Sequence, residues 1–389
     1  MFFLSILFLA IHLIIPGFKH SLVFYHFSLW PVILILGYIL GYSTGFEFNM
    51  LIISYYSLTV IIRLFSYKFY GSKEYHPSKR KIYDLSILLT LLLPFYINYQ
   101  LNLYGLSFHN LVEEVAYSFA VLRQESVSLS GYGSNFNFFN NLVILANFNF
   151  LAALYVNSPK RITFSALLNI FYTSLLGSKM GIVITLLMII IKFFYEGKFM
   201  KVIIGLCTTI FLFIGTIIIV NFTGDSSDYK EIIIALKSYI IGGPLSLDKL
   251  ITANYDVGYS QVIYRPFIEI LRSIGFDLDI GSRHMFYVIV KDFTTNVYSW
   301  FVSFYFNFNP LISMLIMTLY LIVLELISVL KKSSYFIKFI FPSLIIASIF
   351  SIHAEQLLSG FSIYIKLFLI FYFIKYVPSF SNFRWKKSS

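Results

Sequence analysis

The stretch FNPLISMLIMTLYLIVLELISVL, Phe308–Leu330, decides the class of fold. It is almost wholly apolar over twenty-three residues and carries one charged side chain. About 20 consecutive apolar residues are enough to cross the hydrocarbon core of a bilayer as a helix. Backbone polar groups must pair within such a segment, and the alternating pattern of barrel strands is absent. The stretch therefore predicts a membrane-spanning α-helix.

Ten further apolar runs extend this prediction to the whole chain of 389 residues, which is 58% hydrophobic and 12% charged. A typical soluble domain is about 25% charged. We therefore predict an all-α polytopic membrane bundle of about eleven helices, forming one transmembrane domain over residues 1–389. The further runs lie at residues 1–16, 22–41, 48–65, 83–104, 138–156, 162–177, 181–196, 202–220, 335–352 and 361–378.

Basic residues in the short connections set the predicted orientation. With eleven crossings they all fall on one side, which the positive-inside rule assigns to the cytoplasm. Residues 105–137 and 221–307 then form a smaller and a larger extracytoplasmic loop, the larger with interfacial helices. The basic residues are Lys68, Lys73, Lys79, Arg80, Lys81, Lys160, Arg161, Lys198, Lys201, Lys331, Lys332, Arg384, Lys386 and Lys387.

The same distribution argues against nucleic acid as a partner. The net charge of +11 and the 44 Phe and 30 Tyr would suit a nucleic-acid surface. The basic residues, however, lie in short loops, and the aromatic residues lie among Ile and Leu as lipid-facing and interfacial side chains do. The expected surroundings are the lipid bilayer.

The larger loop contains a polar segment, YRPFIEILRSIGFDLDIGSRH, Tyr264–His284. It holds six formal charges in twenty-one residues. Arg265, Arg272 and Arg283 each present a planar guanidinium, which pairs bidentately with phosphate. Arg265, Glu269 and Arg272 share one face of a predicted surface helix. Two interpretations are open: a solvated loop surface near the headgroups, or a site for a diphosphate.

Two further cations stand on the predicted external side. Lys179 lies in the tight turn GSKMG, at the start of the next span, where phosphate is favoured by the helix N-terminus. It could instead extend towards the headgroups as a snorkelling side chain. Arg123 lies in the smaller loop, in a segment that predicts another interfacial helix.

Two histidines are candidates for a general base near neutral pH. His284 ends the arginine segment, and His353 lies in SIHAEQLLSG, two residues before Glu355. A solvated helix terminus is the other interpretation of His353 and Glu355.

No standard nucleotide-binding or hydrolase motif accompanies these residues. The Walker loop, the His–Glu–x–x–His helix and the Gly–x–Ser–x–Gly elbow are all missing from the sequence. Asp277–Leu278–Asp279 matches a metal-binding pattern of nucleotide-sugar glycosyltransferases, but it lies on the side where nucleotide sugars are not found. The single cysteine, Cys207, excludes an intrachain disulfide and a multi-cysteine metal site. We expect no metal and no cofactor.

Residues 175–310 contain the GSKMG turn, the stretch LKSYIIGGPLSLDKLI, an Arg265–Gly281 spacing and a polar and aromatic element that begins at Asn296. Together these elements resemble the Wzy-type O-antigen or capsule repeat-unit polymerases of bacteria. The GSKMG turn resembles their Ser–Arg–Gly-type turn. The stretch LKSYIIGGPLSLDKLI, residues 236–251, resembles the opening of their large periplasmic loop. Arg265 and Gly281 resemble an arginine-to-glycine spacing of these loops. A polar and aromatic element precedes the long helix, and its residues are Asn296, Tyr298, Ser299, Phe304, Tyr305 and FNFNP.

This resemblance implies a bacterial inner-membrane enzyme of the GT-C-like polymerase and ligase architecture, with its active site facing the periplasm. The enzyme would be a metal-independent glycosyltransferase. It would transfer the growing glycan from undecaprenyl diphosphate to the non-reducing end of an incoming undecaprenyl-diphosphate-linked unit. A chain-length regulator and a flippase are further implied partners. Three alternatives are open: a lipid-linked oligosaccharide flippase or transporter, an O-antigen ligase, or a membrane acyltransferase.

The resemblance also implies roles for the candidate residues. Cations would neutralise the diphosphate as the glycosidic bond breaks. A histidine or Glu355 would act as the base, and polar or aromatic side chains would contact the sugars. The diphosphate residues are Arg265, Arg272, Arg283, Lys179 and Arg123; the base candidates are His284, His353 and Glu355; the glycan residues are Asn296, Tyr298, Trp300 and Tyr305.

Overall fold

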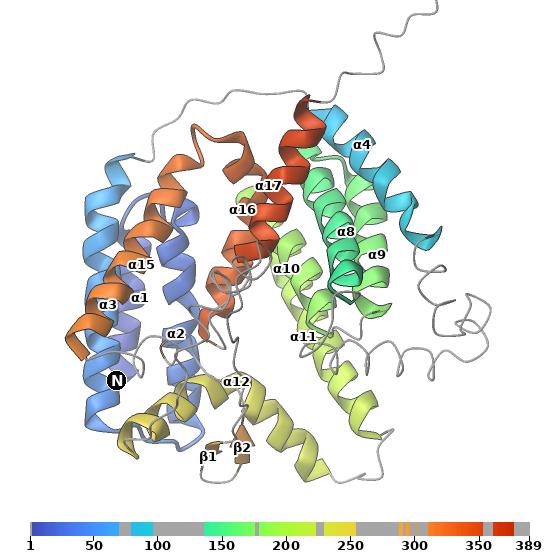
Figure 1. Ribbon diagram of the computed structural model, residues 1–389. Helices are drawn as coiled ribbons and strands as arrows, with labels where there is room; N and C mark the ends of the chain where they lie inside the picture. The colour runs from blue at the N-terminus through green and yellow to red at the C-terminus, as the bar shows by residue number, and fades with distance from the viewer. Residues whose placement is uncertain are drawn as a thin grey trace, which may run out of the picture. The chain divides into compact units, whose positions relative to one another are not determined.

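The computed structural model is mostly helical (Figure 1). It describes residues 2–69, 79–95, 136–175, 179–222, 229–253, 288–290, 293–295, 301, 310–352 and 361–376. Twelve α-helices and one two-stranded hairpin make up most of these residues. The helices are α1 Phe2–Ile14, α2 Leu22–Ile39, α3 Phe46–Ser66, α4 Lys79–Leu91, α8 Phe136–Val156, α9 Pro159–Leu175, α10 Lys179–Tyr195, α11 Phe199–Phe222, α12 Tyr229–Thr252, α15 Pro310–Leu330, α16 Tyr335–Ile349 and α17 Phe361–Tyr376. The strands are β1 Val288–Val290 and β2 Phe293–Thr295.

The predicted helical class is confirmed for the described residues. Each of the eleven predicted apolar runs overlaps one of the helices, and the twelfth helix, α12, lies inside the predicted larger loop. The division into one membrane domain with loops 105–137 and 221–307 stays a prediction, because most of both loops lies outside the described residues.

Among the described residues, three helical segments are long and apolar enough to cross a membrane: Leu22–Ile39, Phe46–Phe69 and Leu311–Leu330. Six shorter apolar helices accompany them in the described part of the chain. Many large apolar side chains on these helices are exposed, such as Phe65 and Leu311, each at 77%. Soluble proteins rarely expose contiguous apolar surface on this scale. These features are consistent with a membrane protein; the number of crossings and their direction stay predictions.

The chain divides into two compact units. The first comprises Met1–Glu74 and Phe193–Ser362, and the second comprises Tyr75–Lys192 and Ile363–Ser389. In the first unit α2 lies at the centre and packs against α1, α3, α12, α15 and α16. The core there is aromatic: Trp30 and Phe27 of α2 are fully buried and meet Tyr55, Tyr56 and Phe301 edge to face.

The second unit is held by polar contacts between helices. Asn149 of α8 accepts a hydrogen bond from Ser86 of α4 (3.0 Å) and donates one to Ser165 of α9 (2.9 Å). Between α9 and α10, Asn169 donates to the hydroxyl of Thr185 at 2.9 Å. Such pairings stabilise helix contacts where lipid offers no hydrogen-bond partner.

The segment GSKMG, predicted as a tight turn, overlaps the start of α10: Lys179, Met180 and Gly181 are the first three residues of this helix, and residues 176–178 lie outside the described residues. Gly181 packs against Thr173, and a Cβ on Gly181 would meet the Cβ of Thr173 at 2.5 Å. Gly181 of α10 therefore lies close to α9, and this close approach requires glycine at position 181.

Candidate functional site

Most of the predicted site residues lie outside the described residues. Lys179 is the first residue of α10, but its side chain is not among those described. The arrangement of the predicted site side chains therefore stays a prediction. Those outside the described residues are Arg123, Arg265, Arg272, Arg283, His284, Asn296, Tyr298, Trp300, Tyr305, His353 and Glu355.

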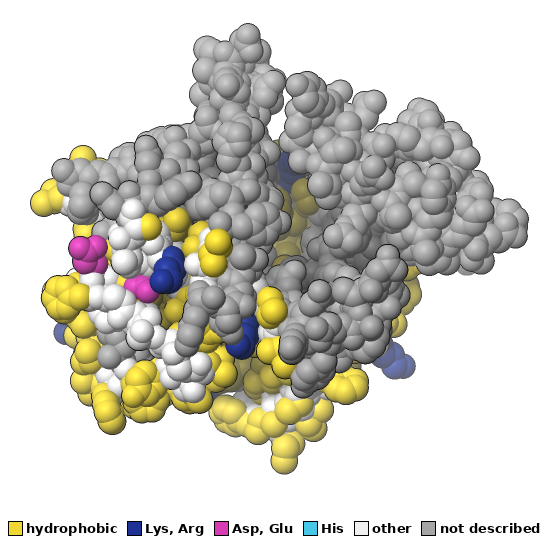
Figure 2. Space-filling model, turned by 90° about the horizontal axis from the view of Figure 1, so that it is seen from below, with side chains coloured by type: hydrophobic (Ala, Val, Ile, Leu, Met, Phe, Trp, Pro, Cys, Tyr) yellow, Lys and Arg dark blue, Asp and Glu magenta, His cyan; other side chains and the backbone are white. Residues whose placement is uncertain are grey.

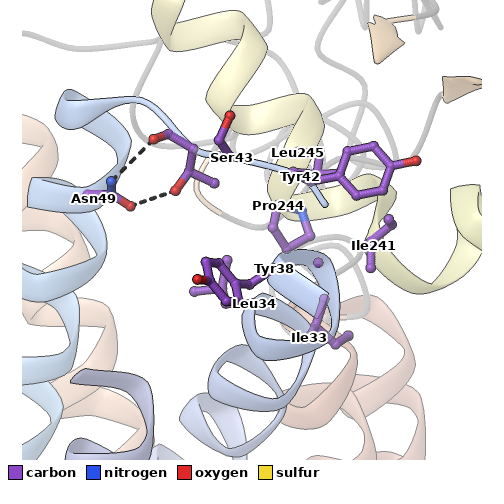
Figure 3. Close-up of a pocket in the computed structure, with 11 residues that line it drawn as sticks. Ile33, Leu34, Tyr38, Tyr42, Ser43, Asn49, Ile241, Pro244 and Leu245 are labelled. Carbon is purple, nitrogen blue, oxygen red and sulfur yellow. Dashed lines mark hydrogen bonds between the residues drawn. The ribbon is translucent and has the colours of Figure 1, made fainter. Parts of the chain in front are cut away.

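A cavity lies in the first unit, where the last turn of α2 and the start of α3 meet α12 (Figure 3). We call this the α12 end of the unit; α12 crosses the lower ends of α2 and α3 in Figure 1. The cavity has a volume of about 200 Å³. Its lining residues are Ile33, Leu34, Gly37, Tyr38, Tyr42, Ser43, Thr44, Asn49, Ile241, Pro244 and Leu245. Aliphatic side chains with a few hydroxyl and amide groups are typical of small-molecule pockets.

Glycine shapes the α2 side of this cavity. Gly41 follows α2 with φ of +80°, a left-handed conformation that other residues rarely adopt. The N–H of Gly41 donates to the carbonyl of Tyr38, and that of Tyr42 to the carbonyl of Gly37, both at 3.0 Å. This pairing ends the helix and turns the chain towards α3. Gly37 leaves open space, since a Cβ there would have no neighbour within 4 Å.

The connection from α2 to α3 is held by its own side chains. The hydroxyl of Thr44 donates to Oδ1 of Asn49 at 2.8 Å, and Nδ2 of Asn49 donates to the carbonyl of Thr44 at 3.3 Å (Figure 3). These two bonds fix the polar wall of the cavity.

A single hydrogen bond joins α12 to the start of α3. Oδ1 of Asp248 accepts the backbone N–H of Gly45 at 2.8 Å. Gly45 is the N-cap residue of α3, where a helix favours a negative group. A Cβ on Gly45 would lie 3.2 Å from the same oxygen, so glycine allows the close approach.

Asp248 is buried, with 7% of the residue exposed. Burial raises its pKa above the ordinary 3.8, while the Gly45 N–H and the Lys249 ammonium act in the opposite direction. The group thus binds its proton more readily than an exposed aspartate does.

Three lysines of the predicted larger loop lie on α12, and the structure describes the side chains of two of them, Lys237 and Lys249. The Nζ atom of Lys237 lies 5.9 Å from the ring centroid of Tyr42, which lines the cavity. Lys249 lies on the exposed side of α12. In Figure 2, the view from below, apolar side chains form most of the described surface, with a few charged side chains between them.

The hairpin is the second described part of the predicted larger loop. β1 and β2 pair antiparallel, with Val288 opposite Thr295, and both strands contact α12. Val288 and Val290 are buried, while Ile289 is 73% exposed. Further along the chain, Phe301 is fully buried, and its ring centroid lies 5.0 Å from that of Trp30 and 5.1 Å from that of Tyr55. The hairpin and Phe301 therefore attach the segment after the arginines to α12, α2 and α3.

A buried arginine is the first of two polar groups that were not among the candidate site residues predicted from the sequence. Arg63 of α3 is 0% exposed and donates to Nδ1 (3.0 Å) and the carbonyl (2.6 Å) of His12, and to the carbonyl of Ile15 (3.1 Å). Nε2 of His12 lies 3.0 Å from the hydroxyl of Thr59, which itself donates to Tyr56. Nδ1 of His12 is thus the acceptor, and Nε2 carries the proton.

A buried glutamate is the second. Glu325 of α15 is 3% exposed and accepts hydroxyl hydrogen bonds from Ser21 at 2.8 Å and Ser66 at 2.6 Å. The Ser21 hydroxyl in turn accepts the N–H of Phe24 and so caps α2. Glu325 therefore ties α15 to the start of α2 and the end of α3.

A signal for these groups was present in the sequence. Arg63 and Glu325 are ionisable residues inside apolar runs, and such residues in membrane helices are usually paired and functional or structural. Asp248 had a weaker signal, because it follows the helix breakers Gly242, Gly243 and Pro244 in a segment predicted as a loop.

Comparison with known proteins adds no relative: no family model, no curated protein and no solved structure matches this chain. The resemblance to the Wzy-type polymerases thus rests on the residues quoted for it.

Proposed function

We propose that this chain is a Wzy-type repeat-unit polymerase, a metal-independent glycosyltransferase acting on polyprenyl-diphosphate-linked glycans at the α12 end of the first unit. The observation that carries the proposal is the docking of α12. Residues 236–251, which resemble the opening of the polymerases' large loop, lie within this helix. Asp248 fixes the helix to the start of α3, and the helix borders the cavity.

Chain connectivity supports a diphosphate site near this end. Arg265 and Arg272 lie between α12 and the hairpin, and Arg283 is five residues before Val288. One residue spans at most about 3.6 Å, so Arg283 is tethered near a hairpin that contacts α12. Three guanidinium groups at this end would suit a diphosphate, which each can bind bidentately.

In the proposed reaction a hydroxyl at the non-reducing end of the incoming unit attacks the anomeric carbon of the growing chain. The bond from that carbon to the diphosphate oxygen breaks, the hydroxyl proton passes to a base, and undecaprenyl diphosphate leaves. Negative charge develops on the leaving oxygen in an oxocarbenium-like transition state. Arg265, Arg272 and Arg283 would stabilise that charge, and His284 or His353 would accept the proton.

The proposal is tested by deleting the gene in the source bacterium and separating the surface polysaccharide by length. Loss of a polymerase leaves a single repeat unit on its acceptor. Loss of a flippase removes the repeats altogether, and loss of a ligase leaves finished polymer attached to the polyprenyl carrier. Either of the last two patterns contradicts the proposal.

Point variants then test the arginines. Arg272→Ala and Arg283→Ala should abolish long chains at a normal protein level, because a diphosphate contact is lost. Arg272→Lys should retain part of the activity, since it keeps the charge and loses the bidentate geometry. Lys160→Ala, at an exposed position in the predicted cytoplasmic connection, is the matched control. Normal chain length in both alanine variants removes these arginines from the mechanism.

A further inference from the structure

Three connections that are far apart in the sequence meet at the other end of the first unit. The Tyr195 hydroxyl, at the end of α10, donates to the carbonyl of Lys19 in the turn between α1 and α2. The rings of Tyr195 and His20 lie 5.9 Å apart. The Nζ atom of Lys331, between α15 and α16, lies 4.7 Å from the Tyr195 ring centroid. We call Lys19, His20, Lys331 and Lys332 the Lys331 cluster.

Aromatic rings hold the ammonium groups of this cluster. Lys331 Nζ lies 3.7 Å from the ring centroid of Phe341, in addition to its contact with Tyr195. Lys19 Nζ lies 5.0 Å from the centroid of Phe194 and 5.6 Å from that of Phe199. Cation–π contacts favour the cation at the ring face but leave its charge uncompensated. The rings thus position two lysines without neutralising them.

Two carboxylates lie in the chain segments next to the cluster, and both have partners. Glu196 pairs with Lys198 at 2.6 Å, and Glu325 accepts hydrogen bonds from Ser21 and Ser66. Within the described residues, Lys19, Lys331 and Lys332 form no ion pair with a carboxylate. The cluster is therefore a concentration of positive charge that an anion would stabilise.

The pKa values of His20 and Lys331 are both lowered, in part by the positive charges of neighbouring lysines. Burial lowers the pKa of His20, and the charges of Lys331, Lys19 and Lys332 lower it further. Burial, with a smaller effect of Lys338, lowers the pKa of Lys331 to about 7. A bound anion would favour the protonated form of both groups.

We propose that the Lys331 cluster binds a phosphate group. Three lysines and one histidine from two connections lie there, and aromatic rings contact the ammonium groups of Lys19 and Lys331. Among the described residues, no carboxylate pairs with these lysines. The phosphate could belong to the headgroup of an anionic phospholipid, because basic pockets between helices bind such headgroups on the cytoplasmic side. It could also belong to a soluble phosphate compound.

This site is separate from the proposed polymerase site. Lys19 and His20 of the cluster lie just before the first residue of α2, while the cavity lies at the last turn of that helix. At 1.5 Å per residue, α2 separates the two sites by about 27 Å. The inference therefore does not depend on the proposed function.

The test uses the full chain in phosphatidylcholine nanodiscs, with the unfolding temperature as the readout. One arm titrates inorganic phosphate and inorganic pyrophosphate; the other replaces part of the phosphatidylcholine by phosphatidylglycerol. We expect stabilisation of the wild type in one arm, and that arm identifies a soluble phosphate or a lipid headgroup as the ligand. In Lys19→Gln/Lys331→Gln the concentration giving half-maximal stabilisation should rise about tenfold or more, since each lysine near a phosphate surface contributes substantially.

Two further variants distinguish the loss of the binding site from a change in net charge and from a folding defect. Lys331→Arg keeps the cation and should respond as the wild type does. Lys160→Gln removes an exposed lysine of the second unit, which is not part of the cluster, and should also respond as the wild type does. The proposal is overturned if neither arm stabilises the wild type, or if Lys160→Gln weakens the response as much as the double variant.

Discussion

Oδ1 of Asp248 on α12 lies 2.8 Å from the backbone nitrogen of Gly45, directly before α3, although 203 residues separate them in the chain. This contact fixes α12, which lies in a segment predicted as part of a loop, to the start of α3. In that position α12 forms one wall of the cavity. It also places a carboxyl group at the N-terminus of a helix, where negative charge is favoured.

Replacing Asp248 by Ala should destabilise the protein. The half-buried N–H of Gly45 would lose its acceptor, which costs about 1 kcal/mol. Asp248→Asn keeps an acceptor oxygen and should lose less. Thermal unfolding followed by circular dichroism in detergent measures both, and equal stability of the Ala variant and the wild type would show that the bond does not hold α12.

Stability should also depend on the protonation of Asp248. Burial raises its pKa in the folded protein above 3.8, so the folded state binds this proton more tightly than the unfolded chain does. The stability that the group contributes is fully present below pH 3.8 and is lost as the pH rises through the folded-state pKa. The free energy of unfolding is measured for the wild type and for Asp248→Asn across this range. As the pH rises, the value for the wild type should fall relative to the value for Asp248→Asn. A difference between the two proteins that is constant with pH contradicts the raised pKa.

Glu325→Leu should be strongly destabilising. The hydroxyls of Ser21 and Ser66 would both lose a buried acceptor, at a cost of about 2 kcal/mol or more. Glu325→Gln, which keeps one carbonyl oxygen, should cost less. Leu326→Ile, at an exposed position on the same helix, is the control. Denaturant unfolding in detergent measures the series, and a Leu variant as stable as the control would refute the structural role.

Gly181→Ala should disrupt the crossing of α9 and α10. Its Cβ would lie 2.5 Å from the Cβ of Thr173, and overpacking of this kind costs about 1–3 kcal/mol. Thr173→Gly in the same chain should restore stability by removing the opposing atoms. Gly215→Ala in α11, where a Cβ has no neighbour within 4 Å, is the matched control. The folded fraction on size exclusion after mild heating distinguishes them; identical behaviour of Gly181→Ala and Gly215→Ala would contradict the close packing.

Gly37→Leu tests whether the cavity serves the proposed reaction. A Cβ at Gly37 has no neighbour within 4 Å, so the larger side chain can enter the cavity of about 200 Å³ without a clash at its base. We expect a folded protein whose polymerisation rate falls about tenfold or more, equal to about 1.4 kcal/mol in the barrier. Gly37→Ala should have a smaller effect. Long polysaccharide at the normal rate in the Leu variant would show that substrate does not use this cavity.

Helix positions followed well from the sequence, as α15 and α4 illustrate. The apolar run 308–330 became α15, Pro310–Leu330, within two residues at its start. The run 83–104 overlaps α4, Lys79–Leu91, which begins earlier because the helix continues into basic residues that an apolar pattern does not mark. Residues 96–104 of the run lie outside the described residues. α12 was harder to predict, since Gly242, Gly243 and Pro244 disfavour a helix that packing against α2 and α3 then stabilises.

The candidate site was predictable only as residue types. Arginines and histidines were selected for their chemistry, but those residues lie outside the described part of the chain, and their roles stay predictions. Asp248, Arg63 and Glu325 were not selected, because each gains its partner from a distant segment.

The sequence by itself determined the helical class and the positions of most helices, because apolarity is a local property and a backbone without water must pair within its own helix. Only the tertiary structure decided that α12 closes a cavity over α2 and α3 and that Lys19 and Lys331 meet around Tyr195. Those relationships join residues hundreds of positions apart, and packing between helices, not the local pattern of any one segment, determines which of them meet.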